Sequence, residues 1–253
     1  MSYLTDYIFV PLEIAQLVST LLTCRRIRLR KSHLGVLLDL AIYTFVSCLA
    51  KTVASLLYLL QLAQEQYVAR YPLYYSMPLL FLVSLIGIGS LFYSTMLLHQ
   101  MLIWRNKETE WSLVCRTTLI GLFGTLAYVL FLYFHRMATI NLLDIADYLS
   151  FVSALTWACR IIPQVSVNWF YDTFNVLHKY FLHLEILGCL WVLASYWLLG
   201  RTGLRWYKMP LNAPLKFLAM VNLSACILLV IEKKMYPSRS LAYHAIPKQE
   251  DQC

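Results

Sequence analysis

Seven long apolar segments run along the chain and restrict its fold more than any other feature of the sequence. They cover residues 7–24, 34–62, 76–104, 112–134, 148–171, 177–200 and 211–232. A helix that crosses a bilayer needs about 20 mainly apolar residues, which each segment approaches or exceeds. Hydrophobic residues make up 60% of the 253 and charged residues 13%, which excludes an ordinary soluble domain. We therefore predict an all-α membrane protein with seven transmembrane helices.

The basic residues predict the orientation of these helices. Most of the 21 Lys and Arg fall on one side of the expected bundle, in the loops after the first, third and fifth segments and in the tail. Because short basic loops stay in the cytosol, the N-terminus is expected in the lumen and the C-terminus in the cytosol. The first segment lacks a basic leader and a small-residue cleavage site, so we interpret it as a permanent helix.

The same residues argue against several classes of function. The cations flank the membrane segments and form no soluble basic module, so we expect membrane lipids as partners and no nucleic acid. The seven cysteines lack metal-ligand spacing, and we predict no metal and no cofactor. No catalytic triad, HExxH motif or phosphate-binding glycine loop is found, so we predict that the protein is not an enzyme. The oligomeric state stays open, a homo-oligomer included.

A polar cluster interrupts the fifth apolar segment, at Arg160, Pro163, Gln164 and Asn168. Each such side chain is costly in lipid unless it faces protein or water, and proline frees a backbone carbonyl. Gln164 and Asn168 are four residues apart, so both amides lie on one face of a helix. The cluster predicts either an internal polar cavity with a hinge at Pro163 or hydrogen bonds that hold helices together.

The residues after this cluster resemble the PQ-loop family, the seven-helix membrane proteins that include cystinosin-like transporters and share a fold with sugar-efflux transporters and the KDEL receptor. The resemblance rests on Pro163-Gln164, Asn168, the polar loop 172–175 and the sequence Leu184-Glu185-Ile186-Leu187-Gly188. The family's earlier motif is degenerate here: residues 31–40 are similar to it, but its Pro-Gln pair falls either on Leu22-Thr23 or on Ala15-Gln16.

This resemblance implies two parallel three-helix repeats joined by a linker helix. The expected parts are the first repeat at 1–110, the linker helix at 111–135, the second repeat at 136–232 and a cytosolic tail at 233–253. It also implies a transporter that moves a small polar metabolite, such as an amino acid, across an endomembrane of the lysosome or vacuole, Golgi or ER. Two other functions stay open: a trafficking receptor of the KDEL-receptor type, and a lipid scramblase or membrane scaffold.

The resemblance assigns roles to particular residues. Pro163, Gln164, Asn168 and Arg160 are expected to bind the solute or gate its path. Glu185 and, in the earlier repeat, Asp39 are the candidates for proton coupling, because a carboxyl group among apolar helices can take up and release a proton near neutral pH. The alternative for Glu185 is a permanent ion pair with Arg160. In the tail, the spacing of Tyr243 and Ile246 is similar to an endolysosomal sorting signal.

Overall fold

The computed structural model describes residues 9–30, 36–72, 77, 81–104, 111–135, 140–170, 179–201 and 214–236, and these form helices without any strand. The all-helical prediction is therefore confirmed for this part of the chain. The helices are α2 (Val10–Arg30), α3 (Leu38–Leu59), α4 (Gln61–Arg70), α5 (Phe81–Ile103), α6 (Leu113–Phe134), α7 (Leu142–Cys159), α8 (Ile162–Phe170), α9 (Lys179–Arg201) and α10 (Lys216–Met235).

Five helical segments are long and apolar enough to cross a membrane, which agrees with a multi-pass membrane protein. They are α3, α5, α6, α7 together with α8, and α9. Helices α2 and α10 have similar lengths, but charged residues occupy their last turns, including Arg25, Arg26 and Arg28 in α2 and Lys233 and Lys234 in α10. The structure thus supports five of the seven expected spans by length and composition.

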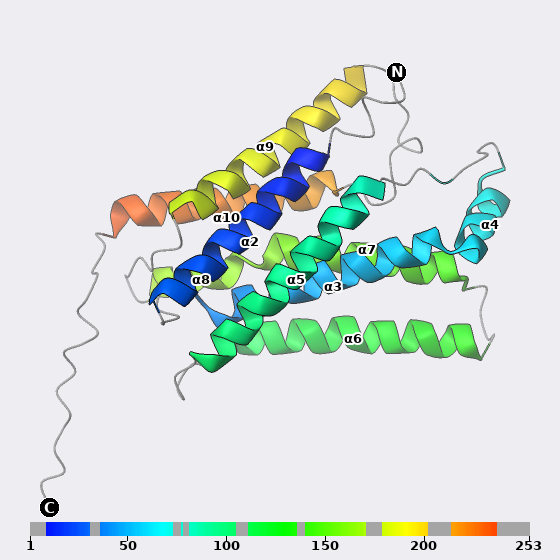
Figure 1. The fold of residues 1–253 in the computed structure, drawn as a ribbon, viewed down its shortest axis with the longest axis horizontal. Helices are drawn as coiled ribbons and strands as arrows, with labels where there is room; N and C mark the ends of the chain where they lie inside the picture. The colour runs from blue at the N-terminus through cyan, green and yellow to red at the C-terminus, as the bar shows by residue number, and fades with distance from the viewer. Residues whose placement is uncertain are drawn as a thin grey trace, which may run out of the picture.

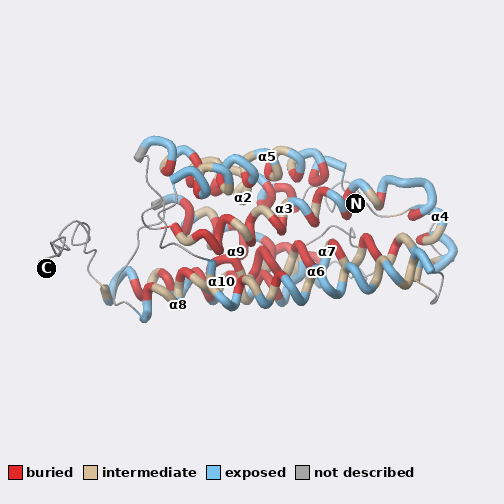
Figure 2. The backbone as a smooth tube through the Cα atoms, turned by 90° about the horizontal axis from the view of Figure 1, so that it is seen from below, coloured by how far each residue is buried: buried red, intermediate tan, exposed pale blue. Residues whose placement is uncertain are grey.

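The long helices lie side by side, and successive ones run in opposite directions (Figure 1). Helix α5 contacts both α2 and α3, and α10 contacts α9, α7 and α8. The first group, α2, α3 and α5, meets the second, α7 to α10, along two seams: α3 packs against α7, and α2 packs against α9. The buried residues face inward along these contacts (Figure 2). Any polar group on the seams is therefore enclosed by protein.

Helix α6 lies at the edge of the bundle (Figures 1 and 2). It packs against α7, and its buried residues are Cys115 and Leu119. Its start is fixed by Ser112, whose side chain accepts a hydrogen bond from the Cys115 amide at 3.1 Å, as expected of a serine N-cap. Most of its apolar surface is free to face lipid.

Several boundaries differ from the predicted segments. The first segment, expected to end at residue 24, continues as helix α2 to Arg30. The second, expected to reach residue 62, ends at Leu59, because Leu60 is extended and the polar helix α4 follows. The fifth begins at Leu142, six residues before its predicted start, where the side chains of Asn141 and Asp144 form a reciprocal capping box. Apolar length detects neither the basic extension of a helix, nor an extended leucine, nor a cap.

Candidate functional site

Helix α7 ends one turn before Pro163, and this break brings Arg160 into the bundle. A proline has no amide hydrogen, and its ring clashes with the carbonyl group four residues earlier, here that of Cys159. Helix α7 ends at Cys159, and Ile162 and Pro163 begin α8. At the turn between α7 and α8, the backbone amide of Gln164 donates a hydrogen bond of 3.0 Å to the Ile161 carbonyl.

Arg160 forms a buried ion pair with Glu185 of α9. Its Nη2 atom lies 2.5 Å from Oε1 of Glu185, and the two side chains are 2% and 1% exposed. The guanidinium carbon also lies 6.0 Å from the ring centre of Trp157 and 5.7 Å from that of Phe181. A charge buried this deeply is costly without a partner, and each of the two residues supplies the opposite charge that the other needs.

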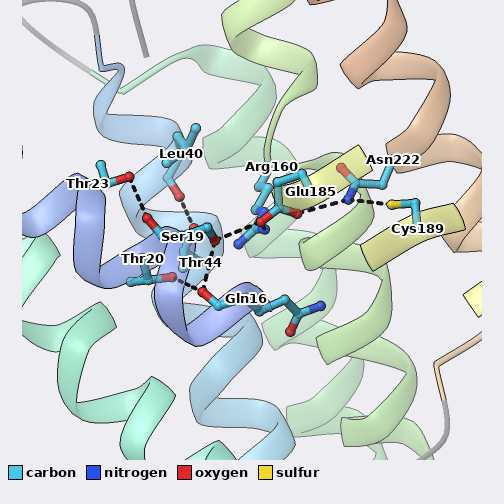
Figure 3. A network of polar contacts seen from close by, with 10 residues as sticks. All are labelled: Gln16, Ser19, Thr20, Thr23, Leu40, Thr44, Arg160, Glu185, Cys189 and Asn222. Atoms are coloured by element: carbon cyan, nitrogen blue, oxygen red, sulfur yellow. Dashed lines mark hydrogen bonds and ion pairs between the residues drawn. The ribbon is translucent and has the colours of Figure 1, made fainter. Parts of the chain in front are cut away.

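Two further helices complete the surroundings of Glu185 (Figure 3). Ser19 of α2 donates a hydrogen bond of 2.8 Å to Oε1 of Glu185, and the Asn222 amide of α10 lies 3.4 Å from Oε2. The side chain of Asn222 also lies 3.4 Å from the sulfur of Cys189. Three buried atoms here, Nε and Nη2 of Arg160 and Oδ1 of Asn222, make no hydrogen bond among the described residues, although Nη2 belongs to the ion pair with Glu185. We call Ser19, Arg160, Glu185 and Asn222 the central network.

Gln164 and Asn168 form a second buried chain, one turn further along. The side-chain amide of Gln164 donates a hydrogen bond of 3.1 Å to Oδ1 of Asn168, and the side-chain amide of Asn168 donates one of 3.0 Å to Oε2 of Glu232. Oε1 of Gln164 accepts a hydrogen bond of 3.3 Å from the backbone amide of Leu37, the residue that immediately precedes α3. The two amides therefore connect α8 with α10 on one side and with the start of α3 on the other.

A second ion pair, between Glu13 of α2 and Lys51 of α3, lies beside a polar cavity of about 230 Å³. The carboxylate of Glu13 is buried, and Lys51 is partly buried. The cavity lies among α2, α3, α5 and α7, and Gln16 lines it one turn after Glu13.

The structure brings Arg160, Gln164, Asn168 and Glu185 close to the break at Pro163, and Asp39 lies two residues after Leu37, which bonds Gln164, but it has a partner of its own. Oδ1 of Asp39 accepts a hydrogen bond of 2.9 Å from the Ser112 amide, at the start of α6. Asp39 therefore joins α3 to α6, and its proposed part in proton coupling stays a prediction. Tyr243 and Ile246 lie outside the described residues, as does the polar loop 172–175.

The two candidate positions of the degenerate motif also differ. Gln16 lines the cavity, whereas the Thr23 hydroxyl donates a hydrogen bond of 2.9 Å to the Ser19 carbonyl of its own helix. The register itself stays open.

Sequence reasoning missed three participants: Ser19, Asn222 and Glu232. Ser19 and Asn222 are uncharged and lie inside apolar segments, where such residues often serve packing alone. Glu232 stands at the edge of the last segment, beside Lys233 and Lys234. The available signal for Asn222 was an amide in the middle of an apolar run.

The described residues contain no group of three or more His, Cys, Asp or Glu side chains that could hold a metal ion. The six cysteines of this part of the chain are free thiols. A scan against protein-family models matches none, and a search of curated proteins finds no match.

Proposed function

We propose that the protein is a carrier for a small polar solute in an endomembrane, built on the PQ-loop plan. The observation that carries this proposal is the central network, in which α2, α9, α10 and the α7–α8 break all contribute to one buried ion pair. A broken helix with polar groups at the interface of two helix bundles is the arrangement that alternating access uses.

The pattern of helix contacts supports two equivalent three-helix repeats. If α2 is exchanged with α7 and α8, α3 with α9, and α5 with α10, each contact within or between the groups becomes another observed contact. Thus α3 on α7 becomes α9 on α2, and α5 on α3 becomes α10 on α9. Helix α6 then joins the repeats. This equivalence favours α2 and α10 as two further spans, which gives seven in all.

Proton coupling follows from the chemistry of Glu185. Its carboxylate is the partner of Arg160, so a proton that binds there removes the negative charge and leaves a buried cation uncompensated. The bundle then has to rearrange or admit a new partner for Arg160. Proton uptake and a conformational change would in this way be linked at one group. In the alternative, the pair is static and only holds α9 against the break.

The carrier is favoured over a receptor that captures a peptide carboxylate. Such a receptor presents free cations to its ligand, whereas Arg160 pairs with Glu185 and Lys51 pairs with Glu13.

The basic ends of α2 and α10 lie at the same end of the bundle (Figure 1), which fits a cytosolic C-terminus and a lumenal N-terminus.

The test is solute uptake by proteoliposomes with an imposed pH gradient. Purified protein is screened against labelled amino acids and sugars, and we expect at least one to accumulate only when the gradient is present. Glu185→Gln should abolish this accumulation, whereas Glu65→Gln, which removes the same charge from the exposed helix α4, should not. Uptake that Glu185→Gln leaves intact would refute proton coupling, and no uptake of any solute would refute the carrier.

A further inference from the structure

The polar cavity beside Glu13 and Lys51 has the features of a ligand site that the Pro-Gln motif does not predict. It is lined by α2, α3, α5, α7 and the two residues before α10, so it lies where the two proposed repeats meet, and it is partly open at its surface. Its walls combine charged groups, several serine hydroxyls and three aromatic side chains, Tyr58, Phe151 and Trp157. Pockets for small molecules commonly have this composition, with an apolar wall and a few placed polar groups.

The cavity lining holds one carboxyl group, Asp147, that no ion pair engages among the described residues. Glu13 and Lys51 neutralise each other in their ion pair. Asp147 also lines the cavity, and Tyr58 donates a hydrogen bond of 2.7 Å to its Oδ1 atom. The nearby Arg70 is bonded to Asp144 instead, at 2.7 Å. Among the described residues, therefore, Asp147 has a hydroxyl partner and no cation of its own.

Two buried polar atoms on the cavity wall have no hydrogen-bond partner within the described part of the chain. They are Nε1 of Trp157, on a side chain that is 5% exposed, and Oγ of Ser90, on one that is 7% exposed. A buried donor without an acceptor is costly, so such atoms indicate that a ligand or water binds there. The indole nitrogen is only a donor, so its partner must carry a hydrogen-bond acceptor.

We propose that this cavity binds a small solute with a protonated amine and a hydrogen-bond acceptor. The ammonium group lies against Asp147 and Glu13, and the acceptor meets Nε1 of Trp157. Gln164 and Asn168 are excluded as the main ligand groups because they bond Leu37 and Glu232 instead. The inference rests on the proposed carrier function, for which it names the class of solute and moves the binding site toward the start of α2.

Three probes of one size test the charge: aminobutanol, butanediol and hydroxybutyrate, which share a four-carbon chain and a hydroxyl group. Each is titrated into the purified full-length protein while thermal unfolding is followed, since a bound ligand raises the midpoint with its occupancy. We expect aminobutanol to raise the midpoint and the other two to leave it unchanged. Equal shifts with butanediol, or no shift with aminobutanol, would overturn the proposal.

Variants test the position. Asp147→Asn keeps an acceptor for Tyr58 and should weaken aminobutanol binding by about tenfold or more, because it removes a partly buried charge partner. Glu65→Gln on α4 should bind as the wild type does. Ala154→Leu narrows the cavity without changing its charges and should also weaken binding. If both cavity variants melt as sharply as the wild type and bind aminobutanol normally, the ligand lies elsewhere and the proposal fails.

The outcome is separable from that of the carrier proposal. Binding of aminobutanol without uptake of any amine into proteoliposomes would retain the site and reject the carrier. Gradient-driven uptake of a neutral or anionic solute, with no binding of aminobutanol, would retain the carrier and reject the amine site.

Discussion

Arg160 and Glu185 each supply the opposite charge that makes burial of the other tolerable. Removing one partner of a buried pair leaves an uncompensated charge, at a cost of about 3–5 kcal/mol, whereas replacing both with neutral groups is often tolerated. We expect Glu185→Gln to lower the thermal unfolding midpoint strongly and the double variant Arg160→Gln with Glu185→Gln to restore part of the loss. Circular dichroism of the purified variants measures both.

The exposed pair of Arg70 and Asp144 provides the control for this prediction. Its side chains are about one third exposed, so Arg70→Gln should change the stability by about 1 kcal/mol or less. If Glu185→Gln melts like Arg70→Gln, the buried pair is not the constraint that its geometry indicates.

Charge and proline made most of these residues predictable from the sequence. Arg160, Gln164, Asn168 and Glu185 stood out because polar groups are rare within apolar runs. Asn222 is also an amide within an apolar run, and Ser19 is a small hydroxyl residue of the kind common in membrane helices. Neither could be assigned to Glu185 in advance, because a single sequence does not specify which helices meet. For Asp39, the sequence indicated a carboxyl group among apolar helices, which the structure shows buried, but it did not indicate the hydrogen bond from the Ser112 amide.

At the scale of single helices, the α7–α8 break is the first feature to test. Pro163→Ala supplies an amide that can bond the Cys159 carbonyl, so we expect α7 and α8 to join into one straighter helix. The protein should then melt at the same or a higher temperature, while uptake of its solute falls because the hinge is lost. Proteoliposome flux and thermal unfolding measure the two effects.

Pro11 is the matched control for that change. It lies in the first turn of α2, where a proline interrupts no helical hydrogen bond, so Pro11→Ala should alter neither property. Flux that falls equally in both variants would argue against a hinge at Pro163.

A second feature of this scale is the close packing of α2 on α9 at Gly188. A Cβ atom there would lie 2.9 Å from Cδ1 of Leu12 and 3.7 Å from Cβ of Ala15. Gly188→Leu should therefore force α2 away from α9, break the bond from Ser19 to Glu185, and destabilise the protein by about 1–3 kcal/mol. Thermal unfolding reports the loss.

Gly121 of α6 offers the comparison within the same protein. Nothing lies within 4 Å of a Cβ atom at that position, so Gly121→Leu should be tolerated. Two equally unstable variants would mean that the effect comes from adding a leucine to any helix, and not from the contact of α2 with α9.

For the whole molecule, the number of spans decides the placement of the termini. If α2 crosses the membrane, an N-terminal epitope and residue 29 lie on opposite faces, and if it does not, both lie on the same face. Seven spans predict that an impermeant maleimide labels Leu29→Cys only from the cytosolic side, while an antibody reaches the epitope only from the lumenal side. Leu29 is 73% exposed, so its reactivity reports sidedness and not burial.

The sequence was a good guide to the helices but a poor one to their neighbours. Apolar length alone predicts α3, α5, α6 and α9. It does not predict α4, whose residues are polar and follow one extended leucine. Leu12 and Ala15 of α2 pack over Gly188 of α9, and no pattern of apolar residues reveals which helix a glycine will face.

The two amides of α8 also have a mechanical consequence. Gln164 ties α8 to the residue before α3, and Asn168 ties it to Glu232 near the end of α10. Because these anchors belong to different halves of the molecule, α8 cannot swing about the Arg160–Ile161 turn while keeping both. At least one of the two hydrogen bonds must therefore break before α8 can turn, and in the proposed carrier the order in which they break would set the order of its movements.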